Sequence, residues 1–212
     1  MPIHLGHERK LWKEGIKLIA GVDEVGRGPL AGPVVAAAVI LPPRINLKGI
    51  KDSKKLSFQK REEFFQKISD LALSVGVGIV DEKRIDGVNI LNASLEAMRS
   101  AILNLNVRPE FVLVDGNKEI PGLDIPQLAI IAGDESSLFV ACASVIAKVT
   151  RDRLMLKYHQ TYPQFHFDQN KGYGTKLHLD ALKTYGPCEI HRFSFNPVKL
   201  CKERQRPLKF KN

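Results

Sequence analysis

The chain has 212 residues, enough for one sizeable hydrophobic core, and its 44% hydrophobic and 26% charged residues are typical of a globular protein. The longest apolar run, residues 33–43, is too short to cross a bilayer, so the composition excludes a membrane-spanning class. The formal net charge of +9 favours nucleic acid as the partner, because basic side chains that neutralise phosphates release counterions. A basic surface that serves only solubility is the alternative.

The cysteines favour a reducing compartment. They are odd in number, widely spaced and without a CxxC pair, which argues against a disulfide framework and a zinc site: Cys142, Cys188 and Cys201. Residues 1–15 lack the hydrophobic segment of a signal peptide. We therefore expect a cytoplasmic protein, with a monomer as the default state.

The first half of the chain contains three predicted strands. The apolar runs 16–22 and 34–41 predict buried strands joined by a loop rich in glycine and proline. Ser57 is suited to cap a helix, and the alternation of apolar with small residues over 71–79 predicts the third strand.

The rest of the chain contains two more predicted strands and three helices. Asn89 is placed to cap a helix whose apolar residues recur at helical spacing up to residue 105. The short runs 111–114 and 127–131 predict strands, and the sequence then predicts a long helix from residue 137 to about 158 and a shorter one over 175–183.

This alternation of strands and helices is typical of a three-layer α/β domain. We expect residues 1–160 to form its core, residues 161–200 a helical C-terminal portion, and residues 201–212 a mobile basic tail.

Three predicted strands finish at acidic residues, namely Asp23 with Glu24, Asp115, and Asp134. Each acid taken alone is more simply read as a turn cap, but ligand sites form at strand ends in open α/β sheets. If the four carboxylates converge, a pair about 4 Å apart repels by about 4 kcal/mol at an effective dielectric of about 20, so a cation is required. Oxygen ligands without histidine or cysteine select Mg²⁺ or Mn²⁺.

One difficulty concerns Asp23 and Glu24. Adjacent strand residues point to opposite faces, so these two can share a site only if the strand ends or bulges there. Gly26 favours an early end. The loop 26–28, Gly-Arg-Gly, allows backbone groups to approach a ligand, although an isolated Gly-x-Gly is more often a tight turn.

The stretch 19–33, IAGVDEVGRGPLAGP, closely resembles the signature segment of the ribonuclease HII family. Further motifs follow in that family's order and spacing, over nearly all of residues 8–198. They are DSKKLS at 52–57, VDG at 114–116, GD at 133–134, ASVIAKVTRD at 143–152, GYGT at 172–175 and HRFSFNPV at 191–198.

The resemblance implies a ribonuclease H-like fold with a central five-stranded mixed sheet flanked by helices, and with the C-terminal portion beside the active-site cleft. It implies an endonuclease that hydrolyses the phosphodiester 5′ of ribonucleotides, in RNA-DNA hybrids and in duplex DNA with embedded ribonucleotides. The products are 3′-hydroxyl and 5′-phosphate ends. The implied roles are ribonucleotide removal and RNA primer removal, with two bound Mg²⁺ or Mn²⁺ ions.

By the same resemblance, site residues carry over one by one. The metal-binding catalytic set is Asp23, Glu24, Asp115 and Asp134. The backbone of Gly26, Arg27 and Gly28 reads the ribose 2′-hydroxyl, and Tyr173 tests the next sugar for deoxyribose. Phosphate contacts come from Lys54, Lys55, Arg192 and Ser194, although a solvated surface role fits each lysine equally well.

Glu135 departs from the pattern, because relatives often place a basic residue there, which puts a phosphate contact at this position in doubt. His178 and His191 could include a general base, but the preferred interpretation is a histidine on a helix surface or a buried hydrogen-bonded one. In the tail, Gln205, Leu208 and Phe210 resemble peptides that dock on bacterial sliding clamps; a frayed basic end is the alternative.

Two rival functions stay open. Ribonuclease HIII carries an extra N-terminal domain and a lysine in the glycine loop, where this chain has Arg27. A non-catalytic binder of hybrid duplexes would have lost part of the acidic set, which is complete here.

Overall fold

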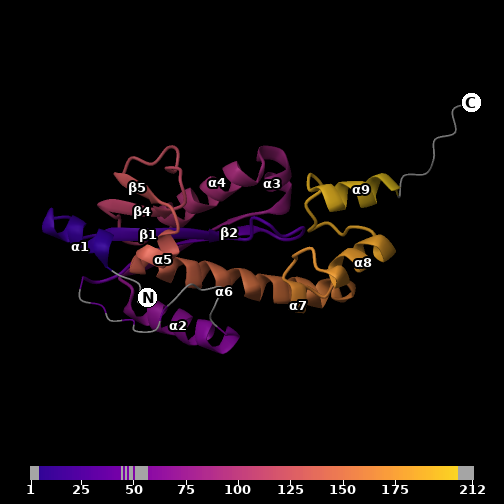
Figure 1. The fold of residues 1–212 in the computed structure, drawn as a ribbon, viewed down its shortest axis with the longest axis horizontal. Coiled ribbons are helices and arrows are strands. Elements are labelled where there is room, and N and C mark those ends of the chain that lie inside the picture. Colours follow the sequence, from indigo (N-terminus) through magenta and orange to yellow (C-terminus); the bar gives the residue numbers. More distant parts are fainter. Residues whose placement is uncertain (1–4, 44, 46, 48–49, 51–56, 205–212) are drawn as a thin grey trace, which may run out of the picture.

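The computed structural model describes residues 5–43, 45, 47, 50 and 57–204. Its centre is one sheet in the order β3-β2-β1-β4-β5 (Figure 1). The strands are β1 (Ile19–Val25), β2 (Val34–Ile40), β3 (Ser74–Val80), β4 (Phe111–Asp115) and β5 (Gln127–Ile130). β2 pairs antiparallel with β1 and β3, whereas β4 pairs parallel with β1 and β5. The predicted five-stranded mixed sheet is confirmed.

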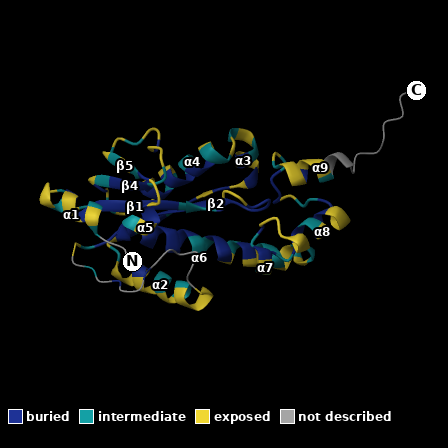
Figure 2. Ribbon diagram, in the orientation of Figure 1, coloured by how far each residue is buried: buried dark blue, intermediate teal, exposed yellow. Residues whose placement is uncertain are grey.

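Helices cover both faces of the sheet and make three layers. Helix α4 (Ile90–Leu103) packs on β1, β2 and β3, and α6 (Leu138–Thr161) packs on the opposite face with α2 (Phe58–Leu71) outside it. Strand β2 and most of β1 are buried, the edge strand β5 is partly exposed, and the outer sides of the helices are exposed (Figure 2). The other helices are α1 (Gly6–Lys13), α3 (Glu82–Val88), α5 (Gly133–Ser136), η2 (Pro163–Phe165), α7 (Phe167–Asn170), α8 (Lys176–Tyr185) and α9 (Asn196–Arg204).

Side-chain caps begin the main helices, and the predicted caps Ser57 and Asn89 are among them. The side chains of Ser57, Asn89, Ser137 and Thr175 each accept a backbone N–H from the first turn of α2, α4, α6 and α8 respectively. These bonds satisfy amides that have no partner inside the helix, so the polar residues fix where each helix begins.

Glycines let the helices approach the sheet closely. A Cβ on Gly21 of β1 would lie 2.2 Å from the Phe139 carbonyl carbon in α6. On β3, a Cβ on Gly76 or Gly78 would lie 2.1 or 2.0 Å from a carbonyl oxygen of α4. Side chains at these positions would therefore push the layers apart.

Helix α1 was not expected, because residues 1–15 mix charged residues and histidines with few apolar ones. Its Glu8 is fully buried and holds the start of α6. Glu8 Oε1 accepts from the Ser137 hydroxyl at 2.6 Å and from the Phe139 amide at 3.2 Å. A carboxylate is favourable there because the N-terminus of a helix carries partial positive charge.

The C-terminal helices α7, α8 and α9 gather at one end of the molecule, next to the loop between β1 and β2 (Figure 1). They form a separate apolar cluster with the end of α6, which includes Met155, Phe165, Phe167 and Leu182. Helix α9 runs to Arg204, so the predicted boundary at residue 201 falls inside a helix. Within the described ranges, none of the helices has the length and apolar character needed to cross a membrane.

We predict that Gly21→Ala destabilises the protein by about 1–3 kcal/mol or more, because the added methyl group meets the α6 backbone. Gly6→Ala is the matched control: its methyl group meets no atom within 4 Å at the start of α1. Thermal unfolding of both variants measures the difference. Equal melting temperatures would show that α6 can move away from β1 without cost.

Candidate active site

Asp23 and Glu24 lie within β1, which pairs with β2 in unbroken register as far as Val25. The expectation that the strand ends or bulges at Asp23 is therefore wrong, because β2 continues opposite both acids and keeps them extended. Alternation sends Asp23 to the face covered by α6 and Glu24 to the face covered by α4. The two carboxylates must meet in another way.

They meet around an open edge of β1. Strand β4 pairs with β1 only as far as Val114 opposite Val22, and it ends at the next residue, Asp115. Beyond that point β4 no longer separates the two faces of the sheet on this edge. One carboxylate oxygen each from Asp23, Glu24 and Asp115 lies within 4.8 Å of the others. The Glu24 amide donates to Asp23 Oδ1 at 2.7 Å.

Asp115 and Asp134 are tied together through Gly133. The Gly133 amide donates to Asp115 Oδ1 at 2.7 Å, and a Cβ on Gly133 would crowd that oxygen at 3.2 Å. Helix α5 begins at Gly133 and carries the buried Asp134 in its first turn. Asp134 does not belong to the cluster of three, but its negative charge acts on Asp23.

The site strongly disfavours its own negative charge. Burial raises the pKa of Asp23 well above its usual range, and the charges of Glu24, Asp115 and Asp134 raise it further. A hydrogen bond with the Ser144 side chain lowers this pKa in part. Burial also raises the pKa of Glu24, and the positive charge of Arg27 opposes this. Such coupled shifts are typical of functional sites, and a bound cation would reverse them.

The donor set fits a hard divalent cation, because it consists of carboxylate oxygens without histidine or cysteine. In the described part of the chain, the buried Glu24 Oε2 has no hydrogen-bond partner. A small pocket of about 30 Å³ opens beside Glu24 and Asp115, with Arg27, Asn117 and Lys118 among its lining residues. An unpartnered carboxylate oxygen at such a pocket is suited to hold a metal ion.

The glycine loop directly follows these acids. Gly26 has φ +97°, a conformation that favours glycine, and the half-exposed Arg27 pairs with Glu24 Oε1 at 3.2 Å. Gly28 lies next to Tyr173, since a Cβ on Gly28 would be 3.7 Å from the Tyr173 ring. The Leu30 amide donates to the Gly172 carbonyl at 2.8 Å, which joins the loop to the segment that carries Tyr173. The loop and Tyr173 thus lie side by side.

Arg192 is not available for the phosphate contact that the resemblance implies. Its side chain is fully buried under the glycine loop. Its five N–H donors all reach backbone carbonyls of the loop, those of Gly26, Arg27, Pro29 and, twice, Gly32, at 2.6–3.0 Å. The prediction is corrected: Arg192 braces the loop from inside. Burial lowers the pKa of Arg192 to about 9.

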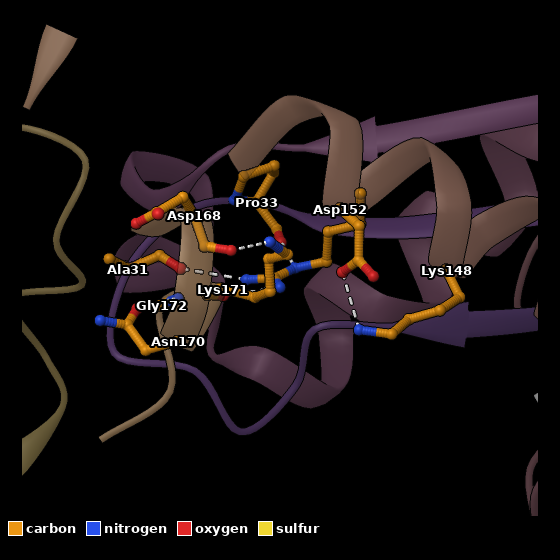
Figure 3. Close-up of polar contacts among 9 residues, drawn as sticks. Ala31, Pro33, Lys148, Asp152, Asp168, Asn170, Lys171 and Gly172 are labelled. Carbon is orange, nitrogen blue, oxygen red and sulfur yellow. Dashed lines mark hydrogen bonds and ion pairs between the residues drawn. The ribbon is translucent and has the colours of Figure 1, made fainter. Parts of the chain in front are cut away.

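A second buried arginine, which sequence reasoning did not single out, braces the far end of the loop. Arg151 of α6 donates to the carbonyls of Pro33, Ala31 and Lys171 at 2.9–3.1 Å (Figure 3). Burial lowers its pKa to about 10. Arg151 therefore holds the loop and the Tyr173 segment to α6, and its place in the motif 143–152 was the available signal.

The remaining predicted phosphate contacts stay predictions. Ser194 is exposed, and its hydroxyl donates to Asp86 Oδ1 at 2.6 Å, so its contact stays a prediction. Lys54 and Lys55 lie outside the described residues. The same holds for Gln205, Leu208 and Phe210 of the tail.

His178 and His191 are fully buried and hydrogen-bonded, as the preferred interpretation has it. Their Nε2 atoms lie 3.0 Å apart, and His178 Nδ1 lies 2.9 Å from the Tyr173 carbonyl oxygen. Neither histidine belongs to the cluster of Asp23, Glu24 and Asp115, so neither is placed to act as a general base there.

Comparisons with known proteins agree with this geometry. The family model of ribonuclease HII matches residues 20–198. Ribonuclease HII of Caldanaerobacter subterraneus subsp. tengcongensis is 54% identical over 89% of this chain and 78% of its own, and that of Syntrophobacter fumaroxidans is 52% identical over 92% and 83%.

Two solved structures are also similar. The crystal structure of ribonuclease H2 from Pyrococcus horikoshii superposes with a TM-score of 0.74 at 30% identity, covering 88% of this chain and 98% of that one. Ribonuclease HII from Archaeoglobus fulgidus, solved in complex with PCNA, gives a TM-score of 0.72 at 28% identity, covering 84% and 95%. The chain therefore belongs to the ribonuclease HII family, whose members are metal-dependent ribonuclease H enzymes.

Proposed function

We propose that the protein is an endonuclease that cuts the phosphodiester 5′ of a ribonucleotide, in RNA-DNA hybrids and at ribonucleotides embedded in duplex DNA. It would leave 3′-hydroxyl and 5′-phosphate ends. The observation that carries the proposal is the meeting of carboxylate oxygens from Asp23, Glu24 and Asp115 beside the glycine loop. Ribonucleotide removal and RNA primer removal are the corresponding roles in the cell.

Asp23, Glu24, Asp115 and Asp134 would hold two Mg²⁺ or Mn²⁺ ions. Bound ions would supply positive charge for the scissile phosphate and for an attacking water. Without such ions the pKa of Asp23 is raised, first because burial disfavours its charge and then because its negative neighbours repel it. Arg27 offsets part of this charge through its ion pair with Glu24.

The loop 26–28 would read the ribose through its backbone. Arg192 engages the carbonyl oxygens of Gly26 and Arg27 from inside the protein. Since a trans peptide directs its N–H opposite to its carbonyl, the amides of Arg27 and Gly28 point away from Arg192. Outward-facing amide donors suit a 2′-hydroxyl oxygen, the group that distinguishes RNA from DNA.

Tyr173 would test the following sugar. Its side chain is 41% exposed and lies next to Gly28, so a nucleotide whose ribose sits on the loop would place its neighbour near the ring. An aromatic ring can stack on deoxyribose, whereas a 2′-hydroxyl there would crowd it. This arrangement supports preference for the junction between RNA and DNA.

The cysteines support a reducing compartment, and we propose the cytoplasm. Cys142, Cys188 and Cys201 are all free. Burial raises the pKa of the Cys142 thiol strongly and that of Cys188 to about 11, so both stay protonated and inert near neutral pH. A monomer remains our proposed state.

Asp23→Asn tests the metal site. We predict that it lowers cleavage of a duplex holding one ribonucleotide by at least about a hundredfold, as expected for the loss of a main charge-stabilising group. Rates are measured in Mg²⁺ or Mn²⁺ and again with chelator, which should abolish wild-type cutting. Binding of the duplex without cleavage by the wild type would contradict the enzymatic proposal and favour a binder.

The same variant makes a stability prediction in chelator. Because the pKa of Asp23 is raised, its contribution to the wild type is fully present below the unfolded-state value of 3.8 and is lost as pH rises through the folded-state pKa. Asp23→Asn should therefore match or exceed wild-type stability near neutral pH, by about 2–4 °C in melting temperature per 1 kcal/mol. Asp180→Asn on the surface of α8 is the control and should change little.

Tyr173→Ala tests the junction role. We predict a loss of kcat/KM at a single embedded ribonucleotide about tenfold greater than the loss within a long RNA tract, the scale of a lost aromatic stacking contact. Tyr185→Ala, which removes an exposed tyrosine from α8, is the control. Equal losses on both substrates would reject the role.

The segment 205–210 is proposed to bind a sliding clamp. The complex of the Archaeoglobus fulgidus relative with PCNA supports the proposal, together with the pattern Gln205, Leu208 and Phe210. We predict that the full chain retains a bacterial clamp in a pull-down and that a chain ending at Lys202 does not. Equal retention of both chains would refute this.

A further inference from the structure

Two buried histidines have no part in the proposed chemistry. His178 lies on α8, and His191 directly precedes Arg192. Both side chains are fully buried, and their Nε2 atoms are 3.0 Å apart. A polar pair in an apolar cluster costs free energy unless every donor meets an acceptor, so the protons of this pair can be assigned.

Only one neutral arrangement of protons satisfies the pair. His178 Nδ1 faces the Tyr173 carbonyl oxygen, which can only accept, so Nδ1 carries the proton and Nε2 is bare. His191 Nδ1 lies 3.0 Å from the Cys188 amide, 3.1 Å from its Sγ and 3.2 Å from its carbonyl oxygen. Because the bare Nε2 of His178 needs a donor, the His191 proton is on Nε2, and Nδ1 accepts the Cys188 amide. Burial lowers the pKa of both rings, that of His191 to about 3, which keeps them neutral.

The pair joins the two parts of the molecule that face the sugars. On one side, His178 holds the carbonyl of Tyr173. On the other, His191 is followed by Arg192, whose guanidinium binds the carbonyls of the glycine loop and whose amide donates to the Leu30 carbonyl at 2.9 Å. Leu30 in turn donates to Gly172, so these contacts close a ring of hydrogen bonds around the loop and Tyr173.

We propose that His178 and His191 are positioning residues that set the spacing between Tyr173 and loop 26–28, and thereby the selectivity for the junction between a ribonucleotide and a deoxyribonucleotide. The inference rests on the proposed sugar-reading roles of Tyr173 and the loop. Neither histidine touches the substrate. His178 acts through the Tyr173 carbonyl, whereas His191 acts through His178 and through Arg192, which follows it in the chain.

Simple packing is the competing explanation. His178 and His191 lie against Phe165 and Phe167, with ring centroids 4.8–6.2 Å apart. A purely structural histidine would therefore be replaceable by phenylalanine without any effect on substrate choice. The two explanations differ in which substitution preserves selectivity.

The experiment compares three variants by the ratio of kcat/KM for a single embedded ribonucleotide to kcat/KM for a long RNA tract. His178→Phe keeps an aromatic ring but leaves the Tyr173 carbonyl unpaired. His178→Asn keeps a donor near the Nδ1 position. Phe167→Leu is the control, because it loosens the same apolar cluster without removing a polar contact.

We expect His178→Phe to lower the ratio about tenfold, the scale of one unpaired buried hydrogen-bonding group, and to speed hydrogen exchange at the Leu30 amide. We expect His178→Asn to stay within about threefold of the wild type, a fraction of that contribution. Phe167→Leu should lower the melting temperature and leave the ratio unchanged.

Three outcomes overturn the inference. An unchanged ratio and unchanged Leu30 exchange in folded His178→Phe would show that the pair positions nothing. An equal fall in Phe167→Leu would assign the effect to packing. Equal losses on both substrates for Tyr173→Ala would reject the proposed junction role and, with it, this inference. The proposal that the protein cleaves its substrate at the carboxylate site would still stand.

Discussion

Mutual repulsion among buried carboxylates is the constraint on which this structure depends. Asp23, Glu24 and Asp115 hold oxygens within 4.8 Å of one another, and Asp134 adds its charge from the start of α5. Folding must supply the free energy to keep these groups together, and the buried centre of the sheet supplies part of it. Strand β1 lies between β2 and β4, and α6 packs closely against its Gly21. A cation bound among these carboxylates would relieve their mutual repulsion, and this would favour cation binding at the site.

The two buried arginines are not paired with the acids of the site but with backbone carbonyls. Arg151 and Arg192 are buried, and the hydrogen bonds of both guanidinium groups run to backbone carbonyls of the glycine loop and its neighbour. A loop without regular structure has carbonyls that no strand or helix satisfies, and two planar guanidinium groups supply donors to them. The loop therefore gains a fixed shape without secondary structure. The amides of Arg27 and Gly28 lie on the side away from Arg192, which is the arrangement that the proposed sugar recognition requires.

Much of the fold could be predicted because it follows from local pattern. The caps at Ser57 and Asn89 and the apolar runs of β2 and β4 are visible in the sequence itself. The acids of the site could be found because they follow apolar runs. What could not be predicted depends on contacts between distant residues. Arg192 looks like a phosphate ligand until its burial is known, and nothing local shows that β4 stops beside Glu24 and opens the edge of β1.

Helix α1 has a practical consequence for anyone who trims this protein for crystallisation or expression. Its charged sequence invites removal, yet Glu8 anchors the first turn of α6 through Ser137 and Phe139. Helix α6 also carries Ser144, whose side chain hydrogen-bonds Asp23, and Arg151, whose side chain holds the glycine loop. Removal of the chain through Glu8 would free the first turn of α6. Helix α6 contacts both the carboxylate site, through Ser144, and the glycine loop, through Arg151. Helix α1 therefore supports the helix that carries Ser144 and Arg151.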